Sequence, residues 1–249
     1  MFLARLFLAC AAAFAGVAAA SPPGTGADPA GTPPAAPQPA PAKAKASALP
    51  YYSTLDFENL PLQEGLCHLP VTGWQQSTDY TCGPASVLSL LRYWGLVTET
   101  DPKILTKIER QLAAEMGSNM TCGTTPEAIL AWFQAHGIAA ALFEQDAEHN
   151  DTVTPYWAWF ALKDRLRAGA PVLVEWSDWG GHWVVAKGFD DRGTADFADD
   201  VIFFADPYDR HDDRMEGTTI FNMERFYWMW YDARLFGRYR ARIHIVPGF

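Results

Sequence analysis

The stretch Gln76–Ser86, which reads QSTDYTCGPAS, places a cysteine immediately before a helix. The apolar residues that follow recur at helical spacing: Val87, Leu88, Leu91 and Trp94. Pro84 suits the first helical turn, where no N–H group is needed, so Cys82 is predicted at or just before the helix N-terminus. Unpaired N–H groups and the helix dipole stabilise a thiolate there, and the thiolate is the nucleophilic form of cysteine.

Gln76 lies six residues before Cys82, within reach of the same site if the loop between them returns. Its side-chain amide and the Cys82 backbone N–H would then form a two-donor oxyanion hole. The alternative is an ordinary surface glutamine, as the neighbouring Gln75 illustrates. Spacing alone does not separate these two interpretations.

The start of the chain is typical of an export signal. Arg5 precedes an apolar run over Leu6–Val17, and three alanines end at Ala20. We therefore predict a signal peptide over residues 1–20, because the apolar run is shorter than the roughly 20 residues that a membrane-spanning helix needs. The alternatives are that the apolar segment is retained as a membrane anchor, or that a lipid is attached at Cys10.

Composition divides the rest of the chain into two parts. Residues 21–48 are rich in proline and alanine and have no aromatic or large aliphatic side chain, which predicts a disordered linker. Residues 49–249 hold all ten tryptophans, so one catalytic-size domain is expected there. The formal net charge is −10, or −11 once the signal and its arginine are lost. Such an acidic protein is not expected to bind nucleic acid through its overall field.

Three cysteines remain beyond the signal, and an oxidising compartment would pair two of them. Cys122 rivals Cys82 because it also precedes a helix, but Thr124 or Thr125 is the natural N-cap there and leaves Cys122 outside it. We therefore predict a Cys67–Cys122 disulfide and a free Cys82. The sequence does not fix this connectivity.

A histidine and an aspartate are predicted to meet this cysteine. Of the six histidines, His182 opens a strand-like run, residues 182–189, behind two glycines that leave room beside its ring. A later run, residues 201–205, ends at Asp206. If the two runs pair antiparallel through loop 190–200, Asp206 lies beside His182 and can orient the imidazole. A turn aspartate before proline is the alternative role.

Two further segments stand out but are not assigned to the site. The acidic loop 190–200 lacks the ligand spacing of a calcium loop, so we expect a solvated hairpin and no metal site. The aromatic run 226–230 is expected to pack in the core instead of binding a ligand.

Together these motifs resemble the bacteriocin-leader-processing (double-glycine) peptidase family of the papain superfamily. The resemblance runs over residues 67–236 and rests on four pieces in a shared order: Gln76, Asp79–Ala85, Gly181–Val185 and Ala205–Pro207. It implies an α+β, papain-like fold, in which a helical N-terminal half carries the nucleophile and an antiparallel sheet carries the histidine and aspartate.

The resemblance also implies a role for each matching residue. Cys82 is the nucleophile, His182 the general base and then acid, Asp206 its partner and Gln76 the oxyanion donor. Four neighbouring residues are expected to contact the substrate: Asp79, Tyr80, Gly181 and Trp183. Neither a cofactor nor a metal is expected.

The function expected is that of an exported cysteine peptidase, periplasmic or secreted, that hydrolyses a peptide bond and either processes a secreted peptide or protein or serves a secretion system. Membrane contact is expected only if the N-terminus is retained or lipidated. Well-known members of the family cut leader peptides within transporters, whereas this chain carries its own signal. A peptidoglycan peptide hydrolase, a catalytically silent peptide-binding module and a transglutaminase-like acyl transferase are the alternatives.

Overall fold

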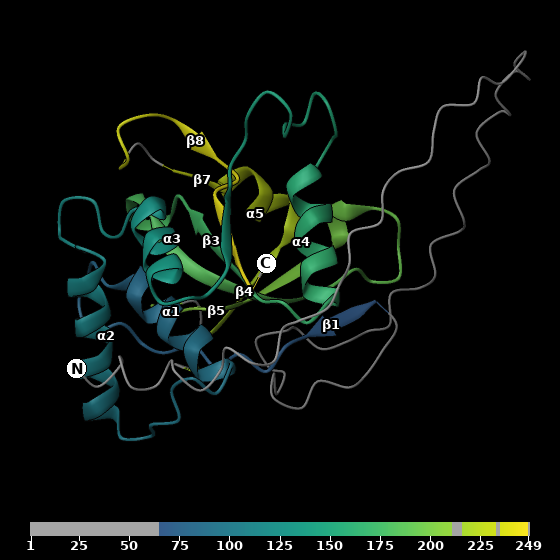
Figure 1. The fold of residues 1–249 in the computed structure, drawn as a ribbon. Helices are drawn as coiled ribbons and strands as arrows, with labels where there is room; N and C mark the ends of the chain where they lie inside the picture. Colours follow the sequence, from purple (N-terminus) through teal and green to yellow (C-terminus); the bar gives the residue numbers. More distant parts are fainter. Residues whose placement is uncertain (1–64, 211–215, 233–234, 249) are drawn as a thin grey trace, which may run out of the picture. The chain divides into compact units, whose positions relative to one another are not determined.

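The computed structural model describes residues 65–210, 216–232 and 235–248 (Figure 1). The predicted signal peptide, the predicted linker and the first residues of the predicted catalytic domain lie outside these ranges. Within them, helices cover both faces of an antiparallel sheet, which confirms the predicted α+β, papain-like fold class.

After the short strand β1 (Leu66–His68), three helices follow along the chain: α1 (Cys82–Tyr93), α2 (Pro102–Glu115) and α3 (Pro126–Ala135). The starts of α2 and α3 are set locally, because each has a proline in its first turn and a side-chain cap before it. Asp101 accepts a hydrogen bond from the Lys103 N–H, and Thr125 accepts one from the Ala128 N–H. Helix α1 begins at Cys82, as the sequence predicts.

Seven strands form one antiparallel sheet in the order β2-β9-β3-β4-β5-β6, with β1 also paired to β4. Their bounds are β1 (Leu66–His68), β2 (Ala140–Phe143), β3 (Val172–Trp176), β4 (His182–Asp190), β5 (Val201–Ala205), β6 (Thr218–Asn222) and β9 (His244–Pro247). The short strands β7 (Tyr231–Asp232) and β8 (Arg240–Ala241) pair separately.

The register of the central strands positions the site. His182, the first residue of β4, pairs with Trp176 of β3. On the other side of β4, Val185 pairs with Ala205, the last residue of β5. The chain therefore leaves β5 at Asp206 beside the start of β4, as the predicted antiparallel pairing requires.

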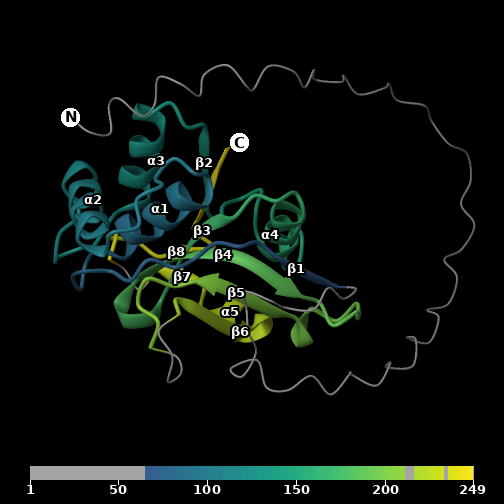
Figure 2. The ribbon, with the colours of Figure 1, turned by 90° about the horizontal axis from the view of Figure 1, so that it is seen from below.

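Both faces of the sheet are covered, because alternate side chains of each strand point to opposite sides. Leu173 and Val185 pack in a cluster with α1 and α3, whereas Val174 and Val184 pack in a second cluster with α4 (Trp157–Arg167) and α5 (Met223–Met229). Figure 2 shows α1, α2 and α3 grouped on one side of β4 and β5 and α5 on the other. Burial of each large aliphatic side chain stabilises this arrangement by about 1.5–3 kcal/mol.

Two of the segments singled out in the sequence can now be placed. In the run 226–230, Phe226, Tyr227 and Trp230 are buried in the second cluster, whereas Trp228 is 57% exposed. The loop 190–200 is less solvated than predicted, since Asp200 is buried and accepts hydrogen bonds from Trp159 and Lys163. A buried carboxylate needs such partners to offset its desolvation.

Among the described residues, no helix combines the length and hydropathy needed to cross a membrane. In the same part of the chain, no group of three or more His, Cys, Asp or Glu side chains is arranged to hold a metal ion.

Candidate active site

Cys82 is the first residue of α1 and is only 6% exposed. Thr81 stands at the N-cap but makes no side-chain capping hydrogen bond, so its hydroxyl leaves the N–H groups of the first turn open. Ser86, one turn further, donates from Oγ to the Trp183 carbonyl oxygen over 3.0 Å. This bond ties the first turn of α1 to the start of β4.

The imidazole of His182 lies between the thiol and a carboxylate. Its Nε2 is 2.8 Å from Oδ1 of Asp206, and both side chains are almost fully buried. The Cys82 side chain is near enough to the same ring for its hydrogen bond and charge to raise the pKa of His182. Because Nε2 is engaged by Asp206, Nδ1 is the ring nitrogen that remains for the sulfur.

Three hydrogen-bond donors hold the Asp206 carboxylate in place. Its Oδ1 also accepts the Tyr208 N–H at 2.8 Å, and its Oδ2 accepts the Thr219 hydroxyl at 2.7 Å. Burial alone would raise the pKa of Asp206, but the hydrogen bonds and positive charge of His182, together with the bond from Thr219, lower it. The carboxylate is therefore ionised and oriented toward the ring.

The charge balance around His182 favours the imidazolium. Burial acts to lower its pKa, but hydrogen bonds to Asp206 and Cys82 and the charges of these two groups raise the pKa to about 10. A thiolate next to this imidazolium would form the ion pair that activates a cysteine nucleophile.

Aromatic rings enclose the His182–Asp206 pair. Trp176 stacks on the imidazole with 6.4 Å between ring centroids, and the Trp179 ring lies nearly perpendicular to it with 5.1 Å between centroids. Trp179 also contacts Tyr208, the residue whose N–H binds Asp206, and remains 64% exposed. The pair beneath these rings is almost fully buried, and a buried setting strengthens its electrostatic interaction.

The structure brings Gln76 to the same loop region. Its backbone N–H donates to the Pro207 carbonyl oxygen at 2.8 Å, so the residue lies directly beside the strand end that carries Asp206. The side-chain Nε2 donates to the Thr78 carbonyl oxygen at 2.8 Å. Because Nε2 carries two hydrogens, one N–H remains for another acceptor.

A glycine is required immediately before the histidine. Gly181 has a φ of +152°, and a Cβ added there would collide with Leu235 and lie 3.0 Å from Oε1 of Glu175. Glu175 is fully buried on β3, with no hydrogen-bond partner for either carboxylate oxygen within the described ranges. Desolvation raises the pKa of Glu175 well above its usual value, and the nearby Asp232 and Cys82 raise it further.

The four residues expected to contact substrate separate into two groups. Asp79 is exposed, and Tyr80 and Gly181 are half-buried. Asp79 and Tyr80 lie just before Cys82 in the sequence, and Gly181 immediately precedes β4. Trp183, by contrast, is buried in the cluster beneath α1, and its indole N–H donates to the Thr124 carbonyl oxygen at 2.9 Å. Its side chain is part of the core and not of a surface that a substrate can reach.

The predicted Cys67–Cys122 disulfide is wrong, because all three cysteines of the described chain are free thiols. Cys67, expected in an irregular stretch, lies on β1, packs with the α4 cluster and donates to the Leu166 carbonyl oxygen. Cys122 lies in the turn before α3, which packs on the opposite face of the sheet. The sheet therefore separates the two sulfurs.

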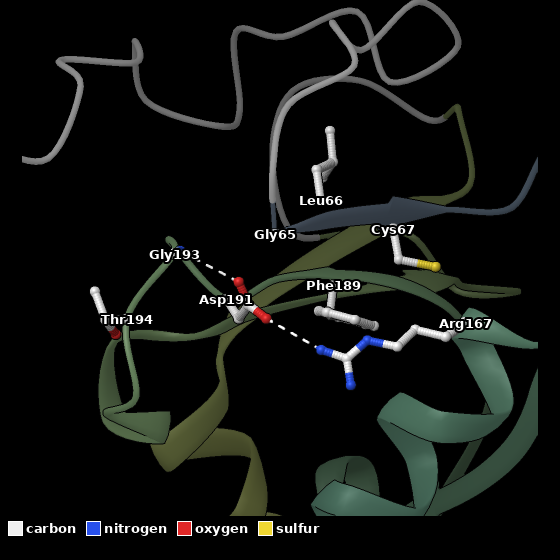
Figure 3. Close-up of a pocket in the computed structure, with 8 residues that line it drawn as sticks. All are labelled: Gly65, Leu66, Cys67, Arg167, Phe189, Asp191, Gly193 and Thr194. Atoms are coloured by element: carbon white, nitrogen blue, oxygen red, sulfur yellow. Dashed lines mark hydrogen bonds and ion pairs between the residues drawn. The ribbon is translucent and has the colours of Figure 1, made fainter.

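Cys67 instead lines a cavity of about 400 Å³, shown in Figure 3. Its walls include Phe189, near the end of β4, and Arg167, whose guanidinium lies 3.3 Å from Asp191. Phe189 is seven residues from His182 along one strand, which corresponds to about 23 Å. This cavity is thus separate from the candidate active site.

The sequence analysis missed two residues of the site, Glu175 and Thr219. Glu175 had a visible signal, because it is the one charged residue in the apolar run 172–176. Thr219 had none, since its contact with Asp206 depends on the pairing of β6 with β5.

Comparison with known proteins identifies the family of this chain. A family profile described as peptidase C39-like matches residues 68–234. No curated protein matches the chain. One similar solved structure is the peptidase domain of Streptococcus ComA, a bi-functional ABC transporter involved in quorum sensing, with 16% identity, a TM-score of 0.45 and coverage of 71% of this chain and 97% of that one. Another is a double glycine motif protease from an AMS/PCAT transporter in complex with the leader peptide, with 16% identity, a TM-score of 0.43 and coverage of 73% and 93%.

Proposed function

Since this chain belongs to the peptidase C39-like family and is a cysteine peptidase, we propose that it cleaves a peptide bond through a Cys82–His182–Asp206 triad. The observation that carries this proposal is the buried 2.8 Å hydrogen bond between His182 Nε2 and Asp206 Oδ1, with Cys82 near enough to raise the pKa of the same imidazole.

In the acylation step, the Cys82 thiolate attacks the carbonyl carbon of the scissile bond. The resulting oxyanion accepts hydrogen bonds from the Cys82 backbone N–H and from the Gln76 side-chain N–H that Thr78 leaves free. His182 then protonates the departing amine from Nδ1, while Asp206 holds Nε2 and stabilises the ring charge. The products of this step are a thioester on Cys82 and a free amine.

In the deacylation step, neutral His182 removes a proton from water, and the hydroxide attacks the thioester carbonyl. The carboxylic acid leaves and the thiolate–imidazolium pair is restored. No other group of the site needs to change its protonation state.

The proposed substrate is a peptide or protein met outside the cytoplasm. The export signal predicted over residues 1–20 supports a periplasmic or secreted location, and the linker over residues 21–48 would place the peptidase at a distance from an attachment point. A secretion apparatus is the proposed partner, because such a system supplies unfolded peptide chains in that compartment.

Two parallel assays with the purified protein test this function. A peptide library analysed by mass spectrometry is expected to give defined cleavage products, whereas purified peptidoglycan analysed by zymography is expected to stay intact. Clearing of peptidoglycan without library cleavage would instead identify a cell-wall hydrolase. Inactivity in both assays, with an unreactive Cys82, would identify a silent binding module.

The pH dependence of kcat/KM is expected to shift when Asp206 is replaced by asparagine. The amide keeps the shape of the carboxylate but loses the charge that stabilises the imidazolium, so the pKa of His182 falls from about 10. The alkaline limb of the profile is therefore expected to move down by about 1 to 3 pH units. An unchanged alkaline limb would show that Asp206 does not set the charge of His182.

A further inference from the structure

A buried carboxylate on α2 organises the loop that enters the active site. Glu109 is fully buried and accepts three hydrogen bonds from that loop. Oε1 accepts the Ser77 backbone N–H at 2.7 Å and the Thr81 hydroxyl at 2.6 Å, and Oε2 accepts the Trp74 indole N–H at 3.0 Å. Every donor lies within the eight residues before Cys82, so one side chain fixes the whole approach to the nucleophile.

The bond to Thr81 continues as a relay to Gln76. The Thr81 hydroxyl has one hydrogen, and Glu109 Oε1 at 2.6 Å is a nearer acceptor for it than the Thr78 carbonyl oxygen at 3.2 Å. Its oxygen then acts as an acceptor toward the Thr78 N–H at 3.2 Å and the Thr78 hydroxyl at 3.0 Å. The Thr78 carbonyl oxygen in turn accepts the Gln76 Nε2 at 2.8 Å. The orientation of the Gln76 amide is thus connected to Glu109 through two threonine contacts.

The same bond has a second effect at the helix start. A threonine at an N-cap ordinarily accepts a backbone N–H of the first turn, but Thr81 makes no such bond. With its hydroxyl held by Glu109, the first-turn N–H groups next to Cys82 stay open to an incoming anion.

The other side of the loop is tied to the aspartate. The Gln76 N–H donates to the Pro207 carbonyl oxygen, and the Gln75 Nε2 donates to the Asp206 carbonyl oxygen at 3.2 Å. Glu109 therefore sets the position of the loop from the α2 side, while Asp206 and Pro207 set it from the sheet side.

We propose that Glu109 is a positioning residue for the oxyanion hole, acting through Thr81 and Thr78 on Gln76 and on the open N-terminus of α1. This inference rests on the proposed peptidase function. Glutamine at position 109 cannot replace the carboxylate, because its NH₂ group must face either the Trp74 indole N–H or the donors Ser77 and Thr81.

The test compares two reactions of the same sulfur. Acylation by p-nitrophenyl acetate passes through an oxyanion, whereas alkylation by iodoacetamide does not. In a Cys67→Ser, Cys122→Ser background, Glu109→Gln is expected to slow acylation about 10- to 100-fold and to leave alkylation close to the parent rate. Equal slowing of both reactions, or of neither, overturns the proposal.

Glu115→Gln is the matched control. Glu115 lies on the same helix and accepts the Trp132 indole N–H at 2.8 Å, so the substitution makes the same change to a carboxylate acceptor away from the loop. It is expected to leave both rates unchanged. Thr81→Val interrupts the relay without touching Glu109 and is expected to slow acylation selectively, which keeps the test valid if Glu109→Gln does not fold.

A double-mutant cycle identifies the route. If Glu109 acts through Gln76, the two substitutions are not independent. The double variant Gln76→Ala, Glu109→Gln is then expected to be acylated faster than the product of the two single-variant effects predicts. Fully multiplicative effects would contradict that route. A parent protein that is not acylated at Cys82 would overturn the proposed function itself. If the parent is acylated and Glu109→Gln does not change the acylation rate, only this inference is overturned.

Discussion

Cys82→Ala is expected to abolish peptide cleavage, with kcat lower by about 10⁶-fold, because no other group can form the acyl-enzyme. The loss of stability should stay small in comparison, since the substitution removes only one sulfur atom at the end of α1. The measurement is cleavage of a peptide from the library assay by equal amounts of the two proteins, with circular dichroism to verify folding.

The chain offers matched controls for this change. Cys67→Ser and Cys122→Ser each remove another free thiol without touching the site. Both variants are expected to retain full activity. If Cys122→Ser lost cleavage activity and Cys82→Ala kept it, the nucleophile would be Cys122, the other cysteine that precedes a helix.

His182→Gln is expected to lower kcat by about 10⁴- to 10⁶-fold, because glutamine can neither take the thiol proton nor return it to the leaving amine. Alkylation of Cys82 by iodoacetamide at pH 7 should also slow by about tenfold or more, since the imidazolium no longer stabilises the thiolate. Both rates are measured on the Cys67→Ser, Cys122→Ser protein.

A second histidine–aspartate contact serves as its control. His149 Nδ1 lies 3.2 Å from Oδ1 of Asp146, but this pair is about half exposed and belongs to a loop without a cysteine. His149→Gln is expected to leave cleavage and alkylation unchanged. Equal losses in the two histidine variants would show that the effect of His182→Gln is not specific to the site.

Local pattern was sufficient to predict the parts of the site that secondary structure determines. Pro84 and the apolar spacing after it placed Cys82 at a helix start. The two apolar runs placed His182 and Asp206 at neighbouring strand ends, because an antiparallel pair brings the start of one strand to the end of the other.

The errors arose where tertiary packing decides. The Cys67–Cys122 disulfide was predicted because the sequence does not show which face of the sheet each cysteine occupies. Trp183 follows His182, but strand alternation turns its side chain into the core beneath α1.

The position proposed for Glu109 could not be predicted from the sequence for the same reason. In the sequence it is one of several charged residues in an amphipathic helix, which is typical of a solvent-exposed position. Only the packing of α2 beside α1 turns it inward to the loop donors and makes its carboxylate an acceptor for Ser77, Thr81 and Trp74.

The central claim is that the sulfur of Cys82 forms the covalent intermediate. It is tested most directly by exposing the protein to p-nitrophenyl acetate, quenching in acid and locating the acetyl thioester by peptide mass mapping. The account predicts a burst of about one equivalent of p-nitrophenolate and an acetyl group on the peptide that contains Cys82, with neither in His182→Gln on the same timescale. No burst, or an acetyl group found on Cys67 or Cys122 in its place, would contradict it.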